Sequence, residues 1–211
     1  VSLPAGISVN STLTMTQGNI SVGTNTLIVA GSLSYTSGTI IGKLRRTLSA
    51  TATEYLFPVG TSSSYNPLKI TFTNLTAGTL TISFQASDIG TAGLPLNDAG
   101  NEIFDRQTTG YWTLTAGTLA STNYNVNLNY NGFSGVDSRA RILKKTNGGN
   151  LVVDGTHGSV ASPEISRTGM NSISTTTTNL AIGKPHPRIT TQPSDFTGCT
   201  ATFSVVVSGK T

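Results

Sequence analysis

Strict alternation of apolar and polar residues is the feature that most limits the folds open to this chain. Between Asn123 and Tyr130, asparagine occupies every odd position and a Tyr, Val or Leu every even one. The same alternation recurs over 68–73 and 80–84. Successive side chains of a strand point to opposite faces of a sheet, so this period of two predicts half-buried β-strands.

The composition favours the same fold class. Only 10% of the residues are charged, against roughly 25% in typical soluble chains. Thr, Ser, Asn and Gly take their place, and these residues suit turns and the solvent faces of strands. Runs of strong helix formers are scarce. We therefore expect an all-β protein.

A weak internal repeat runs through residues 7–42. Three similar apolar segments begin at Ile7, Ile20 and Leu33, thirteen residues apart. Short strands repeated at near-fixed spacing predict a β-solenoid-like repeat over residues 1–50. A plain antiparallel meander would give nearly the same pattern and stays open as an alternative.

Residues 51–183 read as many short strands joined by tight turns, which is typical of a sandwich or barrel. We expect hairpins across Thr76–Gly78 and Asn147–Gly149, and a long loop over 86–106. The expected fold is a short N-terminal solenoid-like repeat packed on an antiparallel β-sandwich, with an extra C-terminal strand.

The C-terminal part, residues 184–211, begins with a proline-containing linker. Prolines 185 and 187 stiffen it because each fixes its own φ angle. A last strand with an apolar face follows, formed by Ala201, Phe203, Val205 and Val207. We expect it to be an orphan strand that either completes the sheet of a neighbour or belongs to a partial repeat.

No catalytic constellation is found, so we expect no enzyme. His157 lies in a turn with Asp154, and His186 lies between two prolines. A nucleophilic site needs an oriented base beside a nucleophile, and no nucleophile-elbow motif accompanies either histidine. The paired acids Glu102 with Asp105, and Glu164 with Asp154, are interpreted as solvated loop acids rather than as glycosidase carboxylates.

Two weaker binding sites are considered. Asp98, Asn101, Glu102 and Asp105 form an oxygen-rich cluster that could hold calcium, although the spacing of an EF-hand loop is missing. No other cofactor is expected. Trp112 and Tyr130 are candidate glycan contacts, since aromatic faces stack on sugars, but an alternating strand more often places such residues in the core.

Charge and hydropathy exclude other partner classes. The net charge is +4 and the sequence pI is about 9.4, but the cations are scattered. A nucleic-acid binder would carry a denser basic stripe, so no nucleic acid is expected. No apolar run approaches ~18 residues, so no membrane insertion is expected. Cys199 is the single cysteine, which excludes an intrachain disulfide.

The order of several short motifs resembles modules of large secreted, adhesin-like surface proteins of the Bacteroidetes group, many of them exported by the type IX pathway. The motifs are Asn19–Val29, Gly42–Leu48, Phe57–Gly60, Tyr111–Leu114 and Asn179–Gly183. The segment from Ile189 to Val207 resembles the start of an immunoglobulin-like repeat, without its Trp-bearing strand.

The resemblance implies an extracellular or cell-surface location and an adhesive or scaffolding role, with self-association or contacts to neighbouring domains. We therefore expect a non-enzymatic structural or adhesive module, and strand addition of the tail would make it a filament subunit. A carbohydrate-binding module of a secreted protein is the alternative. A hydrolase ranks last.

Overall fold

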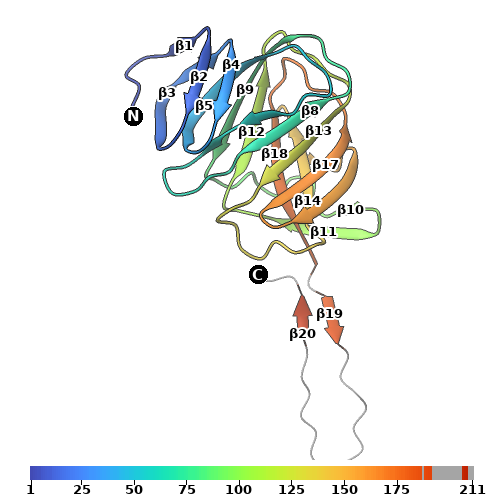
Figure 1. Ribbon diagram of the computed structural model, residues 1–211. Helices are drawn as coiled ribbons and strands as arrows, with labels where there is room; N and C mark the ends of the chain where they lie inside the picture. The colour runs from blue at the N-terminus through green and yellow to red at the C-terminus, as the bar shows by residue number, and fades with distance from the viewer. Residues whose placement is uncertain (187, 192–205, 209–211) are drawn as a thin grey trace, which may run out of the picture.

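The computed structural model describes residues 1–186, 188–191 and 206–208, with side chains up to residue 186. Two main sheets face one another in a sandwich-like arrangement (Figure 1). The all-β expectation is confirmed, and the described residues contain no helix. The protein therefore rests on sheet pairing and on the core between the layers.

The larger sheet has eleven strands. Its main path runs through β1 (Ile7–Val9), β3 (Asn19–Val29), β5 (Thr39–Leu48), β9 (Gly78–Gln85), β12 (Tyr111–Ala116), β18 (Thr178–Pro185), β11 (Asn101–Arg106) and β10 (Leu96–Asp98). Three strands lie off this path: β7 (Val59–Gly60) beside β5, β14 (Arg141–Thr146) beside β18, and β15 (Leu151–Val152) beside β14.

The facing sheet has five strands. Their order is β16 (Thr156–Ala161), β17 (Glu164–Met170), β13 (Tyr124–Asn129), β8 (Leu68–Phe72) and β6 (Tyr55–Phe57), all antiparallel. Two smaller sheets pair β2 (Thr12–Met15) with β4 (Ser32–Tyr35), and β19 (Arg188–Thr191) with β20 (Val206–Ser208).

The N-terminal strands form a parallel stack. Ile7 pairs with Leu27, Leu13 with Leu33, and Ile20 with Ile40, so the partners in each of these pairs lie twenty positions apart. This parallel pairing excludes the antiparallel meander that the sequence also allowed. The thirteen-residue spacing is not the register, because Ile7 lies opposite Leu27 rather than Ile20, and Leu33 lies in β4, which pairs with β2.

Two glycines let the layers of this stack approach closely. A Cβ on Gly31 would lie 1.7 Å from the carbonyl oxygen of Ser11, and a Cβ on Gly38 would lie 2.0 Å from that of Gly18. Gly38 also has a φ of +106°, which side-chain-bearing residues rarely adopt. Both turns therefore require glycine where one layer passes over the next.

The stack and the sandwich share one sheet and one core. Strand β5 pairs in parallel with β3 and antiparallel with β9, where Leu44 lies opposite Ile82. A single cluster of buried hydrophobic residues extends from Met15 to Ile182. The predicted division at residue 50 therefore falls within a continuous layer.

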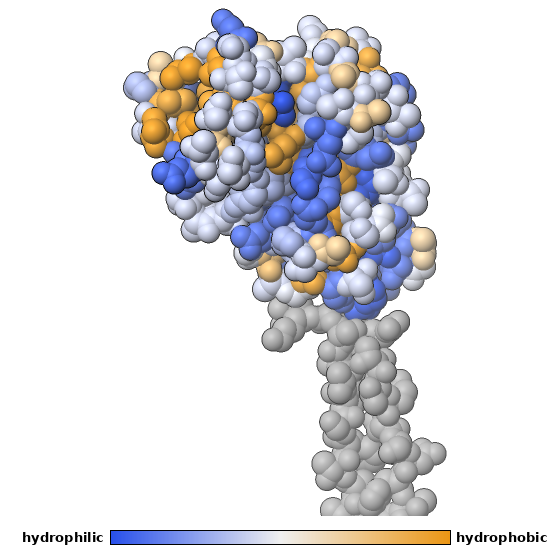
Figure 2. Space-filling model, viewed as in Figure 1, coloured by the Kyte–Doolittle hydropathy of each residue, from blue (hydrophilic) through white to orange (hydrophobic). Residues whose placement is uncertain are grey.

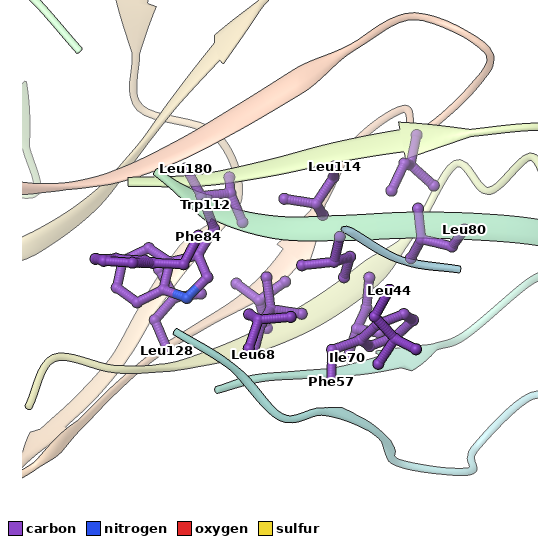
Figure 3. Packing of buried hydrophobic residues seen from close by; sticks show 14 of the residues in the cluster. Leu44, Phe57, Leu68, Ile70, Leu80, Phe84, Trp112, Leu114, Leu128 and Leu180 are labelled. Carbon is purple, nitrogen blue, oxygen red and sulfur yellow. The ribbon is translucent and has the colours of Figure 1, made fainter. Parts of the chain in front are cut away.

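The core lies between the inward faces of the two sheets. Ile70 and Leu128 come from the small sheet, while Leu80, Trp112 and Leu180 come from the large one (Figure 3). All five are at most 1% exposed. At roughly 25 cal/mol per Å² of apolar area, such burial is the main favourable contribution to folding.

Pairing corrects two expectations about hairpins. Strands β8 and β9 do not form the predicted hairpin, because β8 pairs with β6 and β13 while β9 pairs with β5 and β12. The connection crosses from one sheet to the other, which alternation alone cannot reveal. Residues 86–106 contain the β10–β11 hairpin. The hairpin of β14 and β15 is confirmed, with Asn147 and Gly148 at positive φ.

The C-terminal residues are described only in part. Ala201, Phe203 and Val205 lie outside the described residues. Val207 belongs to β20, where it lies opposite Ile189 of β19 in the same chain. The described part of the tail strand thus pairs with the segment that follows the sandwich.

Candidate functional site

The aromatic residues predicted to contact a glycan are buried. Trp112 is 0% and Tyr130 is 7% exposed. The Trp112 ring packs against Phe84 and Phe133, and its indole N–H donates to the carbonyl oxygen of Asn66 at 2.7 Å. Neither ring can stack on a sugar in this position, since alternation along β12 and β13 turns both toward the core. This interpretation of Trp112 and Tyr130 is therefore wrong.

The four residues of the predicted calcium loop do not converge. They lie on the β10–β11 hairpin, where neighbouring side chains point to opposite faces. Asp98 turns inward to two arginines, Asp105 pairs with Arg106, and Glu102 lies 3.6 Å from His186. The backbone of Asn101 pairs with that of Asp98. Within residues 1–186, no three His, Cys, Asp or Glu side chains gather to hold a metal.

Asp98 belongs instead to a buried ionic cluster. Its carboxylate lies 2.7 Å from Nη1 of Arg167 and 3.1 Å from Nε of Arg141. Arg167 is 0% exposed. Burial alone would raise the pKa of Asp98, but the Arg167 hydrogen bond and the charges of Arg167 and Arg141 outweigh it and hold this pKa below its usual range.

Neighbouring groups extend this cluster. Lys144 donates to Asp154 at 2.7 Å, and Asp154 also accepts from the Asn171 side chain at 2.9 Å. Burial, followed by the charge of Arg141, lowers the pKa of His157. Asp154 is thus part of a network that joins the two sheets, through β10 and β14 on one side and β17 on the other, and His157 lies within the field of its charges.

The asparagines of β13 form a bonded surface on the small sheet. Asn127 donates to Glu164 at 2.7 Å, and Glu164 also accepts from Lys69 at 3.0 Å. Asn125 accepts from the backbone N–H of Gly169 at 2.9 Å. Figure 2 shows hydrophilic residues running as a band over β8, β13 and β17. Much of the hydrogen-bonding capacity of this face is already used within the sheet.

The outer face of the large sheet offers a different surface, which we name the hydroxyl face. It is a shallow depression of about 200 Å³ on β3, β5, β9 and β12. Its residues are Thr26, Lys43, Arg45, Thr81, Ser83, Thr113 and Thr115. Each alternates with a core residue of its own strand, so pairing across the sheet sets the hydroxyl groups in rows about 4.8 Å apart.

Two cations lie within this row of hydroxyl groups. Lys43 is exposed, and Arg45 is half-buried with its Nε donating to Thr81 Oγ1 at 3.1 Å. Neither forms an ion pair with an acid among the described residues. The hydroxyl face therefore carries an uncompensated positive charge on a rigid, hydrogen-bonding surface.

Sequence reasoning did not identify this face. A pattern that could have indicated it is the alternation of hydroxyl-bearing residues with apolar ones. These residues are Thr79, Thr81 and Ser83 in one segment and Thr113 and Thr115 in another. The sequence did not show that β5, β9 and β12 are neighbours, and that adjacency is what brings these side chains together.

No described helix is long and apolar enough to cross a membrane. Comparison of the chain with protein-family models, with curated proteins and with solved structures finds no match.

Proposed function

We propose that this chain is a non-enzymatic structural and adhesive module of an extracellular bacterial surface protein, and that it adheres through the hydroxyl face to polysaccharide bearing acidic groups. The observation that carries the proposal is the row of hydroxyl groups around Lys43 and Arg45, two cations with no acidic partner in the described chain. Hydroxyl side chains exchange hydrogen bonds with sugars, and the cations attract carboxylate or sulfate groups.

Rigidity supports an adhesive role. The side chains of the hydroxyl face stand on strands that are paired on both sides, and the strands rest on the shared core. Little conformational entropy is therefore lost when a ligand binds. Each contact is individually weak, but repeated modules along a surface protein would add their contributions through avidity.

The structural half of the proposal rests on the parallel stack. Its parallel pairing at an offset of twenty residues supports a β-solenoid-like interpretation of this part, and we infer that a neighbouring domain packs across β1. Strand β1 pairs only with β3 within the described residues, and Ile7 is 40% exposed there. Figure 2 shows hydrophobic residues gathered over this end of the molecule. Filament formation by strand addition of the tail stays a prediction.

The test is adhesion of beads coated with the full chain to polygalacturonate gel, compared with neutral dextran gel. We expect binding to polygalacturonate that weakens as salt rises, because exposed charge pairs are screened. The double variant Lys43→Gln with Arg45→Gln should lose this binding, and Thr113→Val should weaken it. Lys184→Gln removes one positive charge outside the hydroxyl face, and Thr71→Val removes a hydroxyl from the other sheet, so both should bind normally. Equal adhesion by the wild type and the double variant would refute the proposal.

A further inference from the structure

A second surface depression lies at one end of the sandwich, between the two sheets, and we name it the cleft. Its volume is about 540 Å³, within the range of small-molecule sites. It is bounded by the turn between β7 and β8, by the end of β9, and by the turn that follows β13. Its residues differ from those of the hydroxyl face.

The floor of the cleft consists of Asn66 and Phe84, which are 0% and 7% exposed. Asn66 is held on every side: its N–H donates to Val59, its side-chain amide donates to the carbonyls of Asn129 and Asn131, and its carbonyl accepts from Trp112. These bonds fix the orientation of the amide. Its Oδ1 is nevertheless buried without a hydrogen-bond partner in the described chain.

This unpartnered acceptor is the observation that points to a ligand. Buried polar atoms in folded proteins almost always have a partner. The two donor positions of the Asn66 amide are taken by carbonyls, so exchanging its O and N atoms would not satisfy the group. Asn66 lines the cleft but is 0% exposed, so the floor must open to reach this oxygen, and a hydroxyl group that enters then supplies the missing donor.

The rim of the cleft is pre-organised and neutral. The backbone N–H of Thr61 donates to the carbonyl of Ser64 at 2.8 Å, and Thr61 Oγ1 accepts from the N–H of Ser64 at 3.0 Å. Ser64 Oγ in turn donates to the carbonyl of Asn131 at 2.8 Å. The lining contains hydroxyl and amide groups and no ionisable side chain.

We infer that the cleft binds a single neutral hexose residue. A hexose carries hydroxyl groups all round, which match the Asn66 acceptor and the amide and hydroxyl groups of the rim. The absence of charged groups from the lining disfavours sugar acids and phosphates. This site goes beyond the proposed adhesion, because neither Lys43 nor Arg45 contributes to it.

The test is saturation-transfer NMR of the full chain with glucose, galactose, mannose and N-acetylglucosamine, and with glucuronate as the charged comparison. We expect at least one neutral sugar to bind with a Kd on the order of 1 mM, and glucuronate to bind more weakly. If no neutral sugar receives saturation, or if glucuronate binds best, the inference is overturned.

Rim variants locate the binding without disturbing the core. Ala86→Ile fills the cleft from an exposed position, and Asn131→Ala removes an exposed amide while keeping the backbone carbonyl that Asn66 and Ser64 use. Each should weaken sugar binding roughly tenfold, the cost of one or two lost contacts. Ala77→Ile, at another exposed alanine, should bind normally.

The two proposals fail independently. The double variant at Lys43 and Arg45 should keep full sugar binding, because those residues lie outside the cleft. If polygalacturonate adhesion fails while the NMR signal depends on Ala86, only the hydroxyl-face proposal falls. If a sugar binds equally to wild type and Ala86→Ile, the cleft is not its site and the inference falls.

Discussion

Arg167 and Asp98 are 69 positions apart in the chain, yet Arg167 Nη1 donates to Asp98 Oδ2 at 2.7 Å in the buried region between the sheets. Arg167 belongs to β17 of the small sheet and Asp98 to β10 at the edge of the large one. Arg141 of β14 adds a second cation to the same carboxylate oxygen. One acid thus joins three strands from two sheets.

Replacing Asp98 by Asn should therefore be strongly destabilising. The variant leaves two buried guanidinium groups without their anion, and breaking a buried pair in this way costs about 3–5 kcal/mol. The free energy of unfolding from urea titration measures the loss. Asp105→Asn serves as the control, because Asp105 is partly exposed in its pair with Arg106 and should cost less than ~1 kcal/mol. Equal losses would show that the buried cluster contributes nothing beyond a surface pair.

Stability should fall in acid in two stages. The pKa of His157 is lowered in the folded protein by burial and by Arg141, so the unfolded chain takes up this proton first and stability falls as the pH drops below about 6.5. The pKa of Asp98 is also lowered, so its contribution is present above about 3.9 and is lost as the pH falls through the folded value.

Thermal unfolding between pH 8 and pH 3 separates the two stages. His157→Gln should flatten the decline just below pH 6.5, and Asp98→Asn should flatten the decline at lower pH. An unchanged slope in the His157 variant would contradict the first stage.

Gly31→Ala should weaken the parallel stack. The added Cβ would lie 1.7 Å from the Ser11 carbonyl oxygen, so the two layers must separate. Overpacking of this kind costs about 1–3 kcal/mol. Gly6→Ala tests the same stack at a position where the nearest atom is 3.5 Å away, and it should be tolerated. Faster amide hydrogen exchange over residues 7–35 in the Gly31 variant alone is the expected result.

Trp112→Phe should cost about 1–3 kcal/mol, because it leaves the buried carbonyl of Asn66 without its indole donor. Tyr124→Phe is the matched comparison: the Tyr124 hydroxyl is buried and has no hydrogen-bond partner in the described chain, so its removal should be neutral or stabilising. Chemical denaturation followed by circular dichroism measures both variants. A larger loss for Tyr124→Phe would contradict this assignment of bonded and unbonded groups.

Local patterns in the sequence were enough to predict the strands and their inward faces. The alternation over 68–72 and 80–84 identified which residues are buried, but it could not show that β8 and β9 belong to opposite sheets. Register and adjacency depend on the whole core rather than on any short segment. The same limit hid the hydroxyl face and the pairing of Asp98 with Arg167, since both arise from strands that are distant in the chain.

The predicted glycan and calcium residues failed for a related reason. Trp112 and Asp98 were chosen for their side-chain chemistry, but each is used inside the fold, Trp112 in the aromatic core and Asp98 between two arginines. A chain with few charges places several of them where they hold its layers together. The neutral residues Thr, Ser and Asn are left to face the outside.

Strand β5 pairs in parallel on one edge and antiparallel on the other, and this has a mechanical consequence. Leu44–Leu48 of this strand is hydrogen-bonded to β9, while its other edge carries the parallel stack. Tension applied to the stack would reach the sandwich across this ladder, whose hydrogen bonds would share the load in shear rather than breaking one at a time. A module built in this way would transmit a pulling force between the stack and the sandwich without a hinge.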